Sequence, residues 1–131
     1  TDRTGMPWLS GGGCLISRDF LRMGLLFSRK GAGVENRSIG SATFIDQTLN
    51  LQGPKYMQLS NDKIVYYANQ TMKSGDWIGH SGYGGQFLMI NLKTKLVAGF
   101  FSVLETPSAT DESYKSDMIS MLDDIVSDKY A

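Results

Sequence analysis

The chain has 131 residues, of which 41% are apolar and 20% are charged, and its formal net charge is zero. This length supports one domain with a single core, and the composition is that of a globular chain rather than a disordered one. The neutral balance gives no electrostatic reason to expect nucleic acid or an anionic membrane as a partner. No run approaches the roughly 18 to 20 apolar residues of a membrane span, and the opening TDRTGMPWLSGGG lacks the apolar core of a signal peptide.

Cys14 is the single cysteine and His80 the single histidine. One thiol cannot form a disulfide within the chain, and its place beside three glycines favours a small, half-buried filler over a reactive thiol. A zinc site would need mostly carboxylates, which are scattered along this sequence. We therefore predict no metal and no cofactor.

The first part of the chain predicts loops and two helices. Ser17 is expected to cap a helix over SRDFLRMGLLFSRKG, which Gly31 ends. Apolar or small residues recur there at helical spacing: Phe20, Met23, Gly24 and Phe27. The segment AGVENRSIG is expected to be a loop, followed by a short helix at about SATFIDQTL and a turn at QGP.

The character of the sequence then changes to β-rich. KIVYYAN predicts a strand, QTMKSGD a loop, and WIGHSGYGG an extended segment. QFLMINL and LVAGFFSVL, joined by the short polar link KTK, predict an antiparallel hairpin. The apolar runs are nearly continuous, so both faces of this sheet are expected to be covered.

The end of the chain predicts a helix. Ser108 and Asp111 fit a capping box, and one face is expected to carry Tyr114, Met118, Met121, Leu122, Ile125 and Val126. The fold class is therefore α+β, an antiparallel sheet covered by helices. Residues 1–131 form a single domain or fragment, with loops and helices over 1–55, antiparallel strands over 56–106 and the C-terminal helix over 107–131.

The stretch GHSGYGGQ, residues 79–86, looks like the nucleophile elbow of an α/β-hydrolase. That elbow needs G-x-S-x-G running from a strand into a helix. Here position 83 is Tyr, the next segment reads as a strand, and no second histidine exists to act as the base. An α/β-hydrolase is therefore not expected.

A different family fits this stretch better. The segment HSG-YGGQFLMINLKTKLVAGFFSVL resembles the Lys-Thr-Gly strand of the penicillin-recognising family, whose branches include variants with His first and Ser or Thr second. GGGCLISRDFLRMGLLFSRKG and SIGSATFIDQTL resemble the segments that lie upstream in that family. The resemblance covers most of the chain and is closest to class C β-lactamase-like esterases and aminohexanoate-oligomer hydrolases.

The resemblance implies roles for five residues. His80 would be a polar group near the substrate, Ser81 would hydrogen-bond the substrate through its hydroxyl, and the backbone N–H of Tyr83 would point into the oxyanion hole. Gly82 would leave room for the substrate, and Gln86 would lie at the rim. The alternatives are a structural His80 bound to backbone and a glycine required only by a tight bend. Trp77 is expected in the core.

The family also needs S-x-x-K and Y-x-N, and both patterns occur here, as Ser60–Lys63 and Tyr67–Asn69. S-x-x-K works when its Ser and Lys lie one helical turn apart, so that a Lys of lowered pKa can activate the hydroxyl. SNDK instead predicts a polar turn before a strand, in which Ser60 and Lys63 would point apart, and Tyr67 is expected to be a strand aromatic.

The resemblance therefore implies the C-terminal part of a β-lactamase-like serine hydrolase acting on a small amide, ester or lactam. The nucleophile would lie on an N-terminal segment or a second chain, without which the sheet would show an open edge and an uncovered apolar face. Either another polypeptide completes the fold, or the chain is one piece of a cleaved or truncated enzyme. Independent folding as a monomer is the third possibility, after these two. The alternative function is a non-catalytic binding or assembly domain that keeps the fold, and the compartment is not indicated.

Overall fold

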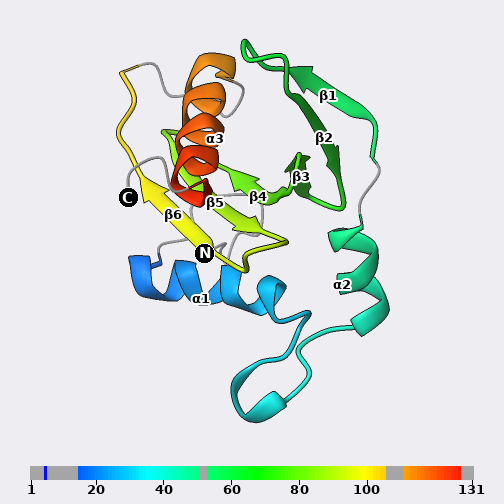
Figure 1. Ribbon diagram of the computed structural model, residues 1–131. Helices are drawn as coiled ribbons and strands as arrows, with labels where there is room; N and C mark the ends of the chain where they lie inside the picture. The colour runs from blue at the N-terminus through cyan, green and yellow to red at the C-terminus, as the bar shows by residue number, and fades with distance from the viewer. Residues whose placement is uncertain (1–4, 6–14, 51–52, 106–110, 128–131) are drawn as a thin grey trace.

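The computed structural model describes residues 5, 15–50, 53–105 and 111–127, so the expectations for Cys14 and Ser108 fall outside the described residues. The fold is α+β (Figure 1). Its helices are α1 (Ser17–Ser28), η1 (Val34–Asn36, a short 3-10 helix), α2 (Ala42–Leu49) and α3 (Glu112–Val126). Its strands are β1 (Lys55–Gln58), β2 (Ile64–Ala68), β3 (Thr71–Ser74), β4 (Trp77–Ser81), β5 (Gln86–Asn91) and β6 (Val97–Phe101).

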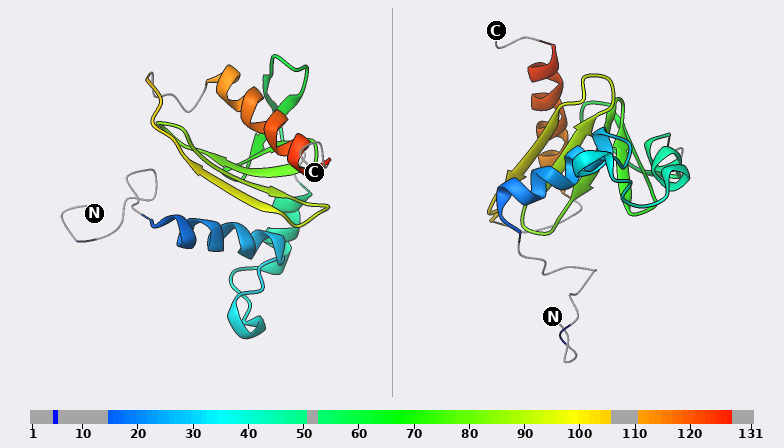
Figure 2. Two further views of the ribbon diagram at one scale, coloured as in Figure 1. Left: turned by 60° about the vertical axis from the view of Figure 1, so that its left-hand side comes forward. Right: turned by 90° about the horizontal axis from the view of Figure 1, so that it is seen from below.

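The six strands form one antiparallel sheet in the order β1-β2-β3-β4-β5-β6, so that each strand pairs with the next in the chain. The helices lie on both faces of this sheet, with α1 on one side of β5 and β6 and α3 on the other (Figure 2). β1 and β6 are the edges of the sheet in the part of the chain described. An open edge, as expected from the sequence, is therefore present at each end of the sheet in these residues, at β1 and at β6.

Two apolar cores lie on the two faces, because side chains alternate along each strand. On the α3 face, Ile119 and Leu122 pack against strand residues that include Val65, Met72, Trp77, Phe87 and Met89. On the opposite face, Ile45 and Leu49 of α2 pack against Ile78, Leu88 and Ile90, with Phe20, Leu21 and Phe27 of α1 beside them. The expectation that both faces are covered is confirmed for these strands, and the uncovered apolar face expected without an N-terminal segment is not found there.

Two helices begin at capping side chains. Ser41 accepts a hydrogen bond from the Phe44 N–H at 3.3 Å, and Asp111 accepts one from the Tyr114 N–H at 2.8 Å. The predicted cap of α1 is wrong. Ser17 is the first helical residue and Ile16 takes the cap position without a side-chain hydrogen bond. Gly31 follows the end of α1 with a positive φ of 84°, which favours glycine.

The segment QTMKSGD was predicted to be a loop, and this prediction is wrong. The segment contains β3, which lies between two tight turns. Asn69 and Gln70 both have positive φ, 49° and 60°, as the two-residue type I′ hairpin turn requires. Gly75, with φ 57°, opens the next two-residue turn, between Ser74 and Trp77. β1 was also missed, since the sequence places only a turn before Lys63. Both strands are four residues long, too short to show a clear alternation.

The buried face of α3 differs from the predicted one. The helix buries Lys115, Ser116, Ile119 and Leu122, whereas Ile125 is 45% exposed. Only Leu122 belongs to both sets, while Tyr114, Met118 and Val126 lie at the border of the core. The buried stripe is rotated toward Ile119, which is not among the residues predicted for the buried face.

Candidate functional site

GHSGYGGQ forms the end of a strand, a tight turn and the start of the next strand. β4 ends at Ser81 and β5 begins at Gln86. The Gly82 N–H donates to the Gln86 carbonyl at 2.8 Å, which closes the hairpin. Gly84 and Gly85 have positive φ of 81° and 93°. No helix follows Ser81, so the stretch is not a nucleophile elbow, as the sequence predicted.

The side chains of His80 and Ser81 lie on opposite faces of the sheet. His80 pairs with Leu88 and shares the face of α1, while Ser81 pairs with Phe87 and shares the face of α3. Strand alternation makes this arrangement unavoidable for neighbouring residues. The two side chains that the resemblance places at one substrate therefore have different surroundings here.

His80 lies in a half-buried, largely apolar setting. The Phe27 ring approaches the imidazole edge-on, with ring centroids 6.2 Å apart. Burial lowers the pKa of His80, and a hydrogen bond with the Gln70 backbone acts in the opposite direction. The imidazole is therefore neutral at physiological pH. These contacts fit the structural alternative for His80, a histidine bound to backbone.

Ser81 lines a pocket of about 260 Å³ together with Tyr56, Tyr67 and Met72. The two tyrosine rings lie against each other with centroids 5.6 Å apart, and they are 47% and 42% exposed. The polar atoms of the lining are the hydroxyl groups of the two tyrosines and Ser81 and the thioether of Met72, so the lining has no charged group. The pocket suits a small neutral molecule with one apolar side.

At the pocket, β4 is no longer paired with β3 but is still paired with β5. The β3–β4 register ends at the Met72–Gly79 pair, whereas the β4–β5 register continues to the Ser81–Phe87 pair. β4 therefore extends two residues past the last β3 pair, along the side where Ser81 and Met72 line the pocket. A strand end that outruns its neighbour can offer its backbone to an extended ligand.

The turn after Ser81 is held by α3. The Tyr114 hydroxyl donates to the Gly85 carbonyl at 2.9 Å, and its oxygen lies 3.1 Å from Ser102 Oγ. Tyr83, at the tip of the turn, is 70% exposed. A Cβ placed on Gly82 would lie 3.3 Å from the Gln86 Cβ, so Gln86 lies directly over Gly82. Gly82, Tyr83 and Gln86 are thus brought together at one turn.

The S-x-x-K pattern is not a catalytic helix. Residues 60 to 62 form the turn between β1 and β2, as predicted. Ser60 donates to Ser116 Oγ at 2.8 Å, and Lys63 forms an ion pair with Asp123. Both side chains therefore contact α3, but at positions two helical turns apart, Ser116 and Asp123, and not each other. Burial lowers the pKa of Lys63, although the charge of Asp124 opposes the shift.

Tyr67 is a strand aromatic, as predicted, but it is also a wall of the Ser81 pocket. This role of Tyr67 and its partner Tyr56 were not predicted from the sequence. The spacing of aromatic residues along KYMQ and IVYYA is a signal for it, but only the β1–β2 register, with its irregularity between Lys55 and Met57, shows which tyrosines meet.

Trp77 lies in the core, as predicted, with 1% of its surface exposed and its indole N–H donating to Asp123 at 2.8 Å. Among the described residues, no group of three or more His, Cys, Asp or Glu side chains could hold a metal ion. No helix in the described ranges is long and apolar enough to cross a membrane.

These features define an α+β protein with a meandering antiparallel sheet, in which β1 to β4 line a small tyrosine-walled pocket beside the glycine turn that follows β4. Comparisons of the chain with protein-family models, with curated proteins and with solved structures found no match.

Proposed function

We propose that this chain is the C-terminal part of a β-lactamase-like serine hydrolase that acts on a small amide, ester or lactam. The observation that carries the proposal is the end of β4, which continues past its last pair with β3, Met72–Gly79, and leads through Ser81, at a pocket, into a glycine turn. That arrangement agrees with the resemblance of HSG-YGGQ to the substrate-binding strand of the family.

In this proposal the attacking hydroxyl, and the general base that activates it, come from an N-terminal segment or second chain that is not part of this sequence. It adds to the substrate carbonyl, and the oxyanion that forms accepts a hydrogen bond from the backbone N–H of Tyr83. A donor of this kind contributes a few kcal/mol in the transition state. The proton of the attacking hydroxyl passes to the general base. Collapse of the tetrahedral intermediate then breaks the C–N or C–O bond, the leaving amine or alcohol takes that proton, and water hydrolyses the acyl-enzyme. Ser81 binds the substrate through its hydroxyl and does not attack it.

The pocket supports the substrate class. Its lining of Tyr56, Tyr67, Met72 and Ser81 contains no charged side chain. A neutral acyl group could therefore bind there without leaving an unpaired charge buried. His80 lies on the opposite face against Phe27. The proposal therefore assigns His80 to positioning β4, Gly82 and Gln86 to the rim, and no cofactor to the reaction.

The proposal also includes a segment or second chain that completes the fold. β6 is an edge of the sheet in the described part of the chain. Next to this edge, Phe101 is 49% exposed and Val103 is fully exposed. An added strand would pair with the β6 backbone and cover these side chains.

The second candidate is a non-catalytic binding or assembly domain. The feature that favours it is the missing nucleophile. Ser60 lies in a turn, bonded to Ser116, and the single histidine of the sequence packs on the face of the sheet opposite Ser81. In this case the tyrosine pocket would bind a ligand without turnover.

The two candidates differ in their reaction with an acylating probe. We would measure intact mass after incubation with a fluorophosphonate and with a β-lactam, for the chain alone and together with the polypeptide encoded upstream of Thr1. The hydrolase proposal expects no adduct on this chain, an adduct on the upstream polypeptide, and slower acylation of the latter when Ser81→Ala is present. Ser38→Ala, in the distant loop, is the matched control.

Failure of the combined polypeptides to react with either probe would favour the binding domain. An adduct on Ser60 or Ser81 of the chain alone would overturn the assignment of the nucleophile to another segment.

A further inference from the structure

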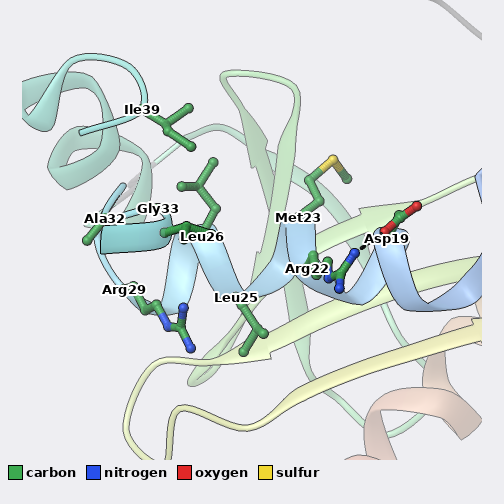
Figure 3. Close-up of a pocket in the computed structure, with 10 residues that line it drawn as sticks. Asp19, Arg22, Met23, Leu25, Leu26, Arg29, Ala32, Gly33 and Ile39 are labelled. Atoms are coloured by element: carbon green, nitrogen blue, oxygen red, sulfur yellow. Dashed lines mark hydrogen bonds and ion pairs between the residues drawn. The ribbon is translucent and has the colours of Figure 1, made fainter. Parts of the chain in front are cut away.

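A second pocket, of about 550 Å³, lies on the side of α1 that faces away from the sheet (Figure 3). It is lined by Asp19, Arg22, Met23, Leu25, Leu26 and Arg29 of α1 and its end, and by Ala32, Gly33, Val34 and Ile39 of the following loop. The loop curls back over the helix because the Ile39 N–H donates to the Gly31 carbonyl at 2.8 Å and Ala32 bridges to Ser38. This pocket is separate from the one at Ser81.

The lining is apolar where a surface helix is usually polar. Met23 is 36% exposed, Ile39 52% and Val34 73%. An outward helix face normally carries charged and polar side chains, while the apolar stripe faces the core. Here the inward stripe already contains Phe20, Leu21 and Phe27, which pack on the sheet. The additional apolar residues therefore form a surface that a ligand could cover.

Two arginines border this apolar surface, and their electrostatic surroundings differ. Arg22 is paired with Asp19 at 2.7 Å, so its charge is already balanced. Arg29 has no acidic partner among the described residues, and Figure 3 shows its guanidinium apart from the Asp19–Arg22 pair. A guanidinium matches the two oxygens of a carboxylate with two parallel hydrogen bonds.

We propose that this pocket binds a small anionic amphiphile, a molecule with a carboxylate on a medium-length apolar chain. The apolar chain lies along Met23, Leu26, Val34 and Ile39, and the carboxylate binds Arg29. The volume is within the range of about 300 to 1,000 Å³ typical of small-molecule sites. Carbonyl groups at the end of α1 disfavour an anion, so recognition of the charge depends on the Arg29 side chain.

The test is an NMR titration of the full 131-residue chain, labelled with ¹⁵N, with sodium decanoate as the probe. We expect saturable shifts of the amide signals of residues 19–33 and 39. Decanamide, which has the same chain without the charge, should bind at least about tenfold more weakly. Decyltrimethylammonium, which carries the opposite charge, should bind more weakly still.

Variants separate the charge from the apolar contact. Arg29→Gln should weaken decanoate about tenfold or more and leave decanamide unchanged. Arg18→Gln, on the exposed start of the same helix and outside the pocket, is the matched control and should change neither. Val34→Ser replaces an exposed side chain, so the fold should survive, and it should weaken both probes.

Equal binding of decanoate and decanamide, or full binding by Arg29→Gln, would overturn the proposal in favour of an apolar contact surface without charge recognition. Shifts that spread over the whole chain without saturation would overturn it as well.

Discussion

The Tyr114 hydroxyl donates a hydrogen bond of 2.9 Å to the Gly85 carbonyl, which joins the first turn of α3 to the glycine turn that follows Ser81. The residues are 29 positions apart in the chain. The same tyrosine packs edge-on against Phe87, with ring centroids 6.1 Å apart. The shape of the candidate site therefore depends on a helix that carries none of its residues.

Replacing Tyr114 by Phe removes this hydrogen bond and keeps the ring. We expect the free energy of unfolding to fall by about 1 kcal/mol, since the partly buried Gly85 carbonyl loses its donor. The amide signals of residues 82–85 should shift as the turn loosens. Urea denaturation and NMR would measure the two effects. Tyr66→Phe, at an exposed strand position, should change stability by less than about 0.5 kcal/mol. Equal effects of the two variants would contradict the role of Tyr114.

Gly79 and Gly82 should respond differently to alanine. A Cβ on Gly79 would overlap the Leu88 carbonyl oxygen of the neighbouring strand, whereas one on Gly82 would meet only the Gln86 side chain and backbone, at 3.3 Å or more. We expect Gly79→Ala to lower the free energy of unfolding by about 3 kcal/mol or to prevent folding, and Gly82→Ala to cost less than about 1.5 kcal/mol. Chemical denaturation gives both values. The reverse order would show that the turn, and not the strand, is the tightly packed position.

His80 should make stability fall at mildly acidic pH. Its pKa in the folded chain lies below the ordinary 6.5, because burial disfavours the charged imidazole. As the pH falls below about 6.5, the unfolded chain binds a proton that the folded chain does not, so folding loses free energy until the folded pKa is reached. NMR titration of the single histidine and urea midpoints between pH 7.5 and 5 would measure this.

His80→Gln should remove this part of the pH dependence, while the carboxylates retain their own effect at lower pH. A His80 midpoint above 6.5 would show that the hydrogen bond with the Gln70 backbone outweighs burial, and stability would then rise on acidification.

Ser74 and Ser116 are two buried serines with different partners. Ser74 Oγ has no hydrogen-bond partner among the described residues, whereas Ser116 Oγ accepts a hydrogen bond of 2.8 Å from Ser60. Burying an unpaired hydroxyl is unfavourable, so Ser74→Ala should be neutral or stabilise the fold by up to about 1 kcal/mol. Ser116→Ala should destabilise it by about 1 kcal/mol. Loss of stability in Ser74→Ala would indicate that a bound water molecule satisfies that hydroxyl.

Much of the fold followed from local patterns. The apolar run of β5, the turn residues after it and the carboxylate at Asp111 each act on neighbours within a few positions, and each led to the observed element. The α1 cap, β1 and β3 did not follow from such patterns. Ile16 has no capping side chain, and TMKS becomes a strand because the turns at Asn69–Gln70 and Gly75 bring it between β2 and β4.

The same limit applies to the candidate site. The glycines after Ser81 indicated a turn, and the β-rich segments on either side indicated strands, so the sequence excluded a nucleophile elbow. It did not show that Tyr56 and Tyr67 meet beside Ser81, because that contact depends on the β1–β2 register and its irregularity.

The sequence by itself determined β2, β4, β5 and β6, the turns between β4, β5 and β6, and the start of α3 at Asp111, since backbone preference and side-chain alternation operate over a few residues. Only the tertiary structure decided which side chains share a face and a pocket. His80 is turned toward Phe27 and Ser81 toward the two tyrosines because the pairing of β4 with β5, and the helices on either side, assign a partner to each face. Such contacts join residues distant in the chain, and their energies depend on packing that no local pattern contains.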